Sequence, residues 1–586
     1  MTLSFASSVL LSVPWLVPHT GALALVGFLP LLFAEDCATQ TGEKHFSLCY
    51  FCAFALWNAL TTFWVCNATV GGGIFAILAN SLQMSLVFAL FRFSRRRLDG
   101  ALPYIFLAVA WIAWERFYHN AQISWPWLTL GNAFAGSTHS VQWYEYTGVL
   151  GGSLWVWACN LGIYGLLCSL ATGSWRRWNV WGRTLSGLAV TLVVVAPLVW
   201  SSIIYRNYEE RSEAVVDTVV AQPDFDPYEK FGSMTQEQQN EVLLSQFDSV
   251  LAQLRSGDSD SAAADARLHS GDVDCVDPTL TGPPSYVAEG GTVARVDQII
   301  NCSGTSARTP RLLVAPETFT GDVILNYMES SPTIRSFREF LKSADGCSLL
   351  FGASTYDIYE RRSAPSILAR PYGPAAWIES HNSALMMKDA DSPVEVYHKS
   401  RLVVGTELTP YPKVFVPIEN AIAKMVGQSG LMGHCIGQKE ASVLHLSDSL
   451  AIGCAVCYES VFGEYCAEYV RKGARALAVI TNDAWWGNTP GYRQHCSYSA
   501  LRAIELRRDI ARSANTGISA FIDQRGDFVS KTPWWTRCTL EGRLNLNSEE
   551  TFFVRHGDFV GRLSTFVFLL LAALLLVKLL IKHKNQ

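Results

Sequence analysis

Residues Leu450–Ala467, LAIGCAVCYESVFGEYCA, contain the feature that decides the fold of the second half of this chain. An apolar, β-prone run from Leu450 to Val456 leads directly into Cys457, and the apolar residues that follow have helical spacing. A strand that turns abruptly into a helix presents its turn residue at the edge of a sheet, near the positive end of the helix dipole. A cysteine placed there can act as a thiolate nucleophile, although most cysteines are inert core residues. The stretch therefore predicts either a nucleophile or a buried thiol at Cys457.

Composition indicates a membrane protein with more than one domain. The chain has 586 residues, of which 49% are hydrophobic, and its mean hydropathy is +0.17. The apolar residues are concentrated in the first third and near the C-terminus. A net charge of -5 gives no polyanion-binding footprint, so nucleic acid is not an expected partner. Cys454 and Cys457 form a CxxC, but no second pair accompanies it and residues three apart on a strand point to opposite faces, which disfavours a zinc or redox site.

Eight apolar runs have the length and composition of membrane spans. Absence of a small-residue cleavage site, and of Lys or Arg before the first run, favours a retained span over a signal peptide. The sequence predicts a transmembrane domain of about seven helices in residues 1–205 and a C-terminal transmembrane helix at 562–582. The runs are 3–17, 20–34, 47–66, 72–92, 101–118, 147–171, 184–205 and 563–581.

Basic clusters predict the orientation of these spans. The clusters occur at Arg92–Arg97, at Arg176–Arg183 and at Lys578–Lys584. If the N-terminus is cytoplasmic, all three lie on the cytoplasmic side, as the positive-inside rule requires. The region between the seventh and the last span is then outside the cytoplasm.

An aromatic loop connects the fifth and sixth runs on the external side. An interfacial belt is the simpler interpretation, and a surface that guides a lipid toward the external domain is the alternative. The aromatic residues are Trp125, Trp127, Trp143, Tyr144 and Tyr146.

Residues 213–550 alternate strand-like and helical patterns, which predicts an α/β domain. Residues 256–306 are rich in Ser, Asp, Gly and Ala and are predicted to be a surface insertion. Within this insertion, Cys275 and Cys302 are equally compatible with a disulfide and with two free thiols. The first elements predicted in the domain are a strand at Val215–Ala221 and a helix at Gln236–Arg255.

Three predicted strands each end in one chemically capable residue. Arg311–Ala315 is followed by Glu317, a predicted hairpin of Ser383–Met387 and Val394–Tyr397 by Lys399, and the Leu450–Val456 strand by Cys457. Since α/β folds place ligands at the carboxyl ends of strands, these side chains are expected to meet. Glu317 would act as a general base and Lys399 would stabilise an oxyanion. Taken singly, a surface glutamate and a solvated lysine are the plainer interpretations.

The three strand ends have a recognisable sequence: VAPET (314–318), YHKSRL (397–402) and AVCYES (455–460). They resemble the Glu, Lys and Cys motifs of the nitrilase, or carbon–nitrogen hydrolase, superfamily. With the membrane spans, the chain resembles the apolipoprotein N-acyltransferases within it. TNDAWWGNTPGYRQH (481–495) is similar to a further segment of that family. The resemblance implies a polytopic α-helical membrane domain joined to an α/β nitrilase-like αββα sandwich outside the cytoplasm.

The resemblance also implies the reaction. The acyl chain of a phospholipid, typically phosphatidylethanolamine, would pass through a Cys457 thioester to the amine of a diacylglyceryl-cysteine on an apolipoprotein. No metal or cofactor would be needed, and a monomer in the bacterial inner membrane with a periplasmic catalytic domain is expected. Supporting roles would fall to Glu407, Tyr458 and Glu459. Trp485 and Trp486 are candidate substrate-binding residues, and packing of their own loop is the alternative interpretation.

Two departures and two alternatives accompany this interpretation. Val404-Gly405-Thr406 stands where the family usually has Pro-Phe-Gly. A lid tryptophan expected after the first strand is absent, and Phe225, Tyr228 or Phe231 could replace it. A membrane-anchored nitrilase or amidase, with water as acceptor, would need the same triad. A degenerate nitrilase-like binding module would not need to retain all three residues.

Overall fold

Long apolar helices form the first third of the chain. The computed structural model describes residues 1–256, 310–344, 346–426 and 433–584, so the predicted insertion and its two cysteines lie almost entirely outside the described residues. A helix covers most of each predicted apolar run, and each of these helices is apolar on most sides. The helices are α1 Thr2–Leu16, α2 Leu29–Thr41, α3 Phe46–Thr62, α5 Val70–Arg95, α6 Leu102–Asn120, α7 Tyr144–Ala171, α8 Val180–Asn207 and, at the C-terminus, α17 Phe559–Lys584.

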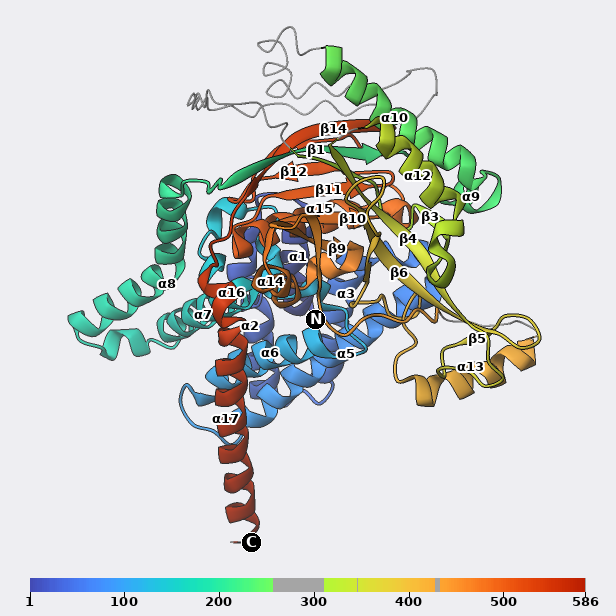
Figure 1. Ribbon diagram of the computed structural model, residues 1–586. Coiled ribbons are helices and arrows are strands. Elements are labelled where there is room, and N and C mark those ends of the chain that lie inside the picture. Colours follow the sequence, from blue (N-terminus) through green and yellow to red (C-terminus); the bar gives the residue numbers. More distant parts are fainter. Residues whose placement is uncertain (257–309, 345, 427–432, 585–586) are drawn as a thin grey trace.

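Five helical segments of the described chain are long and apolar enough to cross a membrane. They are Gly21–Thr41, Val70–Arg95, Tyr144–Ala171, Val180–Asn207 and Phe559–Ile581. α1 and α3 are apolar but shorter, so the number of spans stays a prediction. α17 extends away from the strands, with the C-terminus at its far end (Figure 1). Near that end Lys578 Nζ lies 2.7 Å from the carboxylate of Asp99, which brings two of the predicted cytoplasmic clusters together.

Two β-sheets pack face to face and form the predicted sandwich. The first sheet has the strand order β14-β1-β2-β4-β6-β5, with β3 paired to β4 and β7 to β6, and the second has the order β13-β12-β11-β10-β9-β8. The strands of the first sheet are β1 Ala214–Gln222, β2 Arg311–Val314, β3 Thr320–Ile324, β4 Cys347–Tyr359, β5 Arg370–Pro371, β6 Trp377–Met387, β7 Glu395–His398 and β14 Cys538–Leu546. Those of the second are β8 Val443–Ser447, β9 Leu450–Val456, β10 Ala474–Thr481, β11 Ile510–Ala514, β12 Ala520–Ile522 and β13 Phe528–Lys531.

The alternation of side chains along the strands sorts the core into two layers. Val216 and Val220 of β1 face the second sheet, and Val219 between them faces outward. The outward face of the first sheet is covered by α10 Gln236–Ser256 and α12 Pro332–Ser343 (Figure 1). Pro332 at the first turn and the Ser331 hydroxyl, which accepts the N–H of Ile334, fix the start of α12. The αββα fold class is confirmed.

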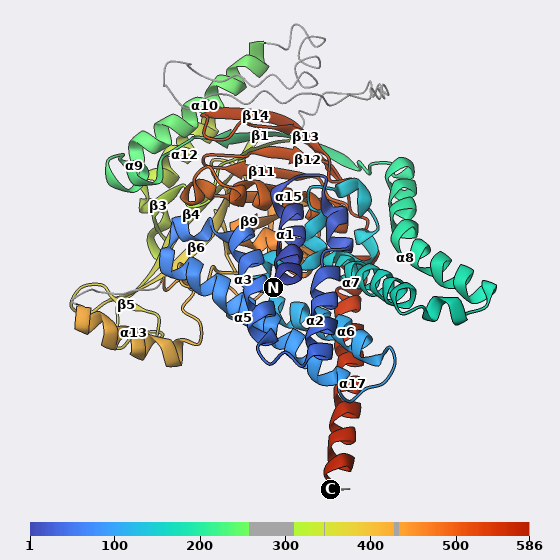
Figure 2. The same cartoon turned by 180° about the vertical axis from the view of Figure 1, so that it is seen from behind.

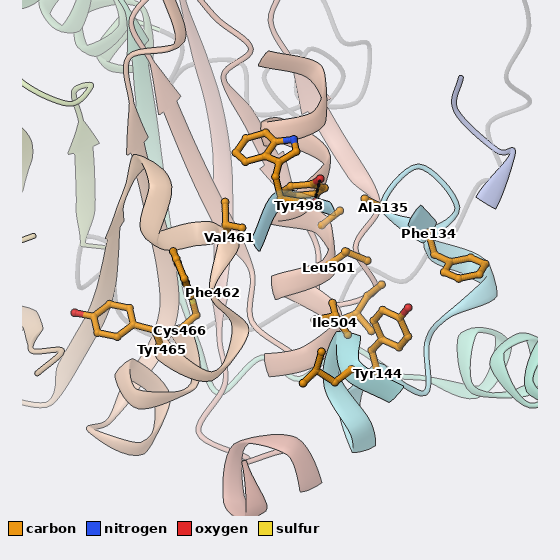
Figure 3. Packing of buried hydrophobic residues seen from close by; sticks show 14 of the residues in the cluster. Phe134, Ala135, Tyr144, Val461, Phe462, Tyr465, Cys466, Tyr498, Leu501 and Ile504 are labelled. Carbon is orange, nitrogen blue, oxygen red and sulfur yellow. Dashed lines mark hydrogen bonds between the residues drawn. The ribbon is translucent and has the colours of Figure 1, made fainter. Parts of the chain in front are cut away.

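The second sheet is covered by α14 Gly463–Arg471 and α15 Pro490–Leu506. Beyond them lie the N-terminal helices, seen from behind in Figure 2. Tyr498, Leu501 and Ile504 of α15 lie between the Val461–Cys466 segment on one side and Phe134 with Tyr144 on the other (Figure 3). Buried side chains of the sandwich and of the apolar helices therefore form one continuous hydrophobic cluster. The smaller helices are α4 Val65–Ala68, α9 Pro227–Gly232, α13 Pro412–Val426 and α16 Phe552–His556.

The aromatic loop between α6 and α7 is buried rather than exposed as a belt. Trp127, Trp143 and Tyr144 are 1%, 4% and 0% exposed, whereas Tyr146 remains 38% exposed. The indole N–H of Trp127 donates to Gln494 of α15, at 2.7 Å. The interpretation of an exposed interfacial belt does not fit the three buried residues, because Trp127 packs against Tyr498 of α15 and Trp143 packs against Trp155 and Trp200.

Candidate active site

The three predicted catalytic residues come together at the carboxyl ends of strands. Glu317 follows β2, Lys399 follows β7 and Cys457 follows β9. Lys399 Nζ donates to Glu317 Oε1 at 3.0 Å. All three side chains are buried, with exposed fractions of 5%, 1% and 9%. The charges of both Glu317 and Lys399 act on the Cys457 thiol. The structure therefore gathers residues that are 140 positions apart into one polar centre.

Cys457 occupies a strained turn. Its φ of +52° lies in the left-handed region that non-glycine residues rarely adopt, and the 3₁₀ turn η8 Cys457–Val461 starts there. Such a turn directs the side chain away from the line of β9, as the abrupt strand-to-helix pattern predicted. Strain of this kind persists only where the surrounding contacts hold it. The contacts that do so are those of Glu459 and of α15, described below.

Burial raises the pKa of the Cys457 thiol well above its usual range, and the charge of Glu317 adds to this shift. Lys399 and a hydrogen bond with Thr481 act in the opposite direction. The resting residue is therefore a neutral thiol, and a base must take its proton when it reacts. Glu317 is the carboxylate whose charge affects the thiol most.

Lys399 is held by two carboxylates. Its ammonium lies 3.0 Å from Glu317 Oε1 and 2.9 Å from Glu407 Oε1. Burial lowers the pKa of Lys399, but the charges of Glu317 and Glu407 outweigh burial and raise this pKa well above its usual range. Glu407 is fixed in turn by the N–H of Val403, which donates to Oε2 at 2.8 Å. The centre therefore contains a permanently charged lysine between two acceptors.

Asn382 is the residue of this centre that the sequence analysis missed. Its side-chain amide donates to Glu317 Oε1 at 2.8 Å and to Glu407 Oε1 at 2.6 Å. A signal was present in the sequence, because the register of the β6–β7 hairpin pairs Ser383 with His398 and so places Asn382 opposite Lys399. The N–H of Lys399 donates to the Asn382 carbonyl at 2.8 Å. The predicted strand began one residue too late to include it.

Glu459 lies behind the centre and connects its two loops. One carboxylate oxygen accepts the N–H of Ser400, at 2.7 Å, and the Tyr397 hydroxyl, at 2.6 Å. The other accepts the N–H of Val456, at 2.8 Å. Burial raises the pKa of Glu459. Glu459 thus links the segment carrying Lys399 to the strand carrying Cys457.

Tyr458 faces the N-terminal part of the chain. Its hydroxyl donates to the carbonyl of Ser124 at 3.0 Å, and its ring stacks on Trp125 with centroids 5.9 Å apart. Trp125 stacks in turn on Trp127, at 5.1 Å. The loop between α6 and α7 therefore forms an aromatic wall beside the residue that follows Cys457.

The two candidate substrate-binding tryptophans differ in their surroundings. Trp486 packs against Trp64, between α3 and α4, with ring centroids 4.5 Å apart. Trp485 is 41% exposed and its ring lies 6.3 Å from that of Tyr228, which is 81% exposed. Of the candidates for the missing lid tryptophan, Phe225 is buried in the outer core and Tyr228 is exposed, and the side chain of Phe231 lies outside the described part of the structure.

Cys457, Asp483 and His495 each offer one metal-ligating atom within 4.8 Å of the others. Arg512, however, donates to Asp483 Oδ2 at 2.6 Å, and His495 Nδ1 lies 2.9 Å from Asp483 Oδ1. A cation would have to be accommodated beside a buried guanidinium, which is unfavourable. The charges of His495 and Arg512 outweigh burial and lower the pKa of Asp483. The three residues are therefore arranged as a hydrogen-bond network.

Both halves of the chain match family models of known proteins. Residues 302–552 match the family model described as Carbon-nitrogen hydrolase, and residues 7–162 match the one described as Apolipoprotein N-acyltransferase N-terminal domain. In both halves the chain is similar to the apolipoprotein N-acyltransferases. The comparisons therefore support the resemblance predicted from the three motifs.

Several curated members of the apolipoprotein N-acyltransferases are similar to this chain. The protein of Chlorobaculum tepidum is 28% identical over 558 residues, which are 93% of this chain and 90% of that one. The Geobacter metallireducens protein is 44% identical over 107 residues, 18% of this chain and 20% of that one. The Thermotoga maritima protein is 31% identical over 170 residues, 29% and 32% of the two chains.

Proposed function

We propose that this membrane protein is an acyltransferase that N-acylates the N-terminal diacylglyceryl-cysteine of bacterial apolipoproteins, with a phospholipid as acyl donor. The observation that carries the proposal is the buried set of Glu317, Lys399 and Cys457, which lies beside an aromatic wall of the membrane domain. The names of the similar proteins supply the acceptor. Phosphatidylethanolamine is the donor expected, and the protein is expected to act as a monomer.

In the first half-reaction Glu317 takes the proton of Cys457, and the sulfur attacks the ester carbonyl of the phospholipid. Lys399 and the N–H of Tyr458 stabilise the oxyanion. The C–O ester bond then breaks, and the lysophospholipid leaves with the proton returned by Glu317. The product is a thioester on Cys457.

In the second half-reaction the amine of the diacylglyceryl-cysteine attacks the thioester. Glu317 accepts the amine proton, the C–S bond breaks and the Cys457 thiol is regenerated. Glu407 positions Lys399, whose ammonium donates to it, and Asn382 positions Glu317, to which its side-chain amide donates. We place the catalytic domain on the periplasmic side of the inner membrane, because the C-terminal end of α17, whose Lys578 contacts Asp99, lies away from the strands (Figure 1).

Intact mass spectrometry tests this proposal. Purified protein in detergent is incubated with phosphatidylethanolamine, with Cys457→Ala as the matched control. A mass gain of one acyl chain on the wild type only, discharged by a diacylglyceryl-cysteine peptide as N-acyl product, is the expected result. Discharge by water alone would favour a hydrolase, and a well-folded wild type without an adduct would favour a binding module.

A further inference from the structure

A buried histidine of α15 contacts the backbone of the turn that holds Cys457. His495 is 0% exposed, and its Nε2 lies 3.1 Å from the carbonyl oxygen of Cys457 and 3.1 Å from the Ser460 hydroxyl. The Ser460 hydroxyl itself donates to the same carbonyl, at 2.8 Å. Ser460 has one hydroxyl proton, which this bond uses, so both partners of Nε2 are acceptors. Nε2 must therefore carry a proton and donate.

The other ring nitrogen is fixed by a charged pair. Nδ1 lies 2.9 Å from Asp483 Oδ1 and 3.2 Å from Arg512 Nη2. Asp483 also accepts the Thr481 hydroxyl, at 2.8 Å. The rings of Trp127 and Trp486 lie 5.9 Å and 5.5 Å from the imidazole. These contacts set the rotation of the ring and so the direction of the Nε2 proton.

The restrained carbonyl has a consequence on the opposite side of its peptide bond. A trans peptide is planar, so the carbonyl of Cys457 and the N–H of Tyr458 point in opposite directions. Holding the carbonyl toward α15 therefore directs the Tyr458 N–H away from α15. In the proposed reaction this N–H is the oxyanion donor next to the nucleophile.

We infer that His495 is a positioning residue: its Nε2 proton holds the Cys457 carbonyl and thereby aims the backbone N–H that stabilises the oxyanion. This role rests on the proposed acyl transfer, because only a reaction at a carbonyl develops an oxyanion there. The turn at Cys457, with its φ of +52°, would then both present the thiol and orient the Tyr458 N–H toward the oxyanion. Asp483 and Arg512 contribute by orienting the imidazole.

Two variants of His495 separate the two ring nitrogens. The side-chain amide of glutamine reaches about as far as Nε2, and that of asparagine about as far as Nδ1. His495→Gln keeps a donor for the Cys457 carbonyl, whereas His495→Asn keeps only the contact with Asp483. For full-length protein in detergent we expect acyl-adduct formation with phosphatidylethanolamine to fall about 10- to 100-fold in His495→Asn and by much less in His495→Gln.

The alkylation of Cys457 by iodoacetamide, followed by peptide mass spectrometry, measures the reactivity of the thiol in a reaction that forms no oxyanion. We expect its rate in both variants to stay within about threefold of wild type, because displacement at a saturated carbon leaves no charge on oxygen. Equal acylation losses in the two variants, or a larger loss in His495→Gln, would overturn the inference. Parallel losses of acylation and alkylation would do the same, since they indicate a general collapse of the turn.

A second variant covers the case in which His495→Asn does not fold. Ser460→Ala removes the other side-chain donor to the Cys457 carbonyl and should also lower acylation more than alkylation; unchanged acylation would refute the inference. A wild type that forms no adduct would instead refute the proposed function, and the role of His495 with it. If the wild type and His495→Asn form the acyl adduct equally well, the role of His495 is refuted while the proposed function stands.

Discussion

Replacing Lys399 by methionine tests whether its ammonium neutralises the two carboxylates. Lys399 is 1% exposed and lies within 3.0 Å of both Glu317 and Glu407. Lys399→Met leaves these acceptors joined only through the Asn382 amide. Removing one partner of a buried ion pair typically costs about 3–5 kcal/mol. For a domain of roughly 340 residues that corresponds to a fall of about 4–7 °C in Tm.

The assay is thermal unfolding of detergent-solubilised protein at several pH values. Because the pKa of Lys399 is raised, its stabilising effect is fully present below the ordinary lysine pKa and is lost only as the pH rises through the raised value. The wild type should therefore show no loss from Lys399 between pH 6 and 9.

Lys342→Met is the matched control. Lys342 lies 3.0 Å from Glu339, a distance like that of Lys399 from Glu317, but it is 58% exposed. An exposed pair of this kind contributes about 0–1 kcal/mol, so the control should have a Tm close to wild type. Equal Tm values for Lys399→Met and wild type at pH 7 would refute the reasoning.

Three further predictions concern buried polar groups around the centre. Glu459→Gln replaces one acceptor oxygen by an NH₂ group that faces N–H donors, so it should lower the free energy of unfolding by about 2–4 kcal/mol in thermal melts. Glu468 is half-buried, and the control Glu468→Gln should change this free energy very little. Because burial raises the pKa of Cys457, its alkylation should accelerate about tenfold per pH unit from pH 7 to 9; a plateau below pH 7 would contradict this. Burial lowers the pKa of Lys230 to about 8, so the unfolded chain binds more protons between about pH 8 and 10.5 and wild-type stability should rise with pH relative to Lys230→Met. A relative fall in that range would show that Lys230 is not held in a desolvated site.

The local pattern of the sequence was enough to predict the strand ends. β9 occupies Leu450–Val456 as predicted, and Cys457 follows it at the turn. β6 and β7 form the predicted hairpin, with Lys399 directly after it. In each case a buried apolar run ends at a polar residue, and this alternation is determined by neighbours in the chain. The meeting of Glu317, Lys399 and Cys457 then followed from the general geometry of strand ends.

The residues that the sequence did not assign depend on contacts between two different elements, whether these are neighbours in the chain or far apart. Asn382 matters because a hairpin register places it opposite Lys399, and His495 because α15 packs across the turn after β9. The burial of Trp127 arises from Gln494, 367 positions away. No periodicity within a single segment contains this information, because each contact needs the position of a second element.

The position of α15 limits how this protein can be divided. In this helix the Tyr498 hydroxyl accepts the indole N–H of Trp15 at 3.0 Å and donates to the carbonyl of Trp127 at 2.8 Å. His495 of the same helix contacts the turn that holds Cys457. A fragment beginning at residue 213 would expose the side of α15 that these tryptophans cover, and water would replace an apolar interior. A soluble version of the catalytic domain would therefore need that side redesigned as a surface, and a chimera between relatives would have to transfer the α6–α7 loop together with α15.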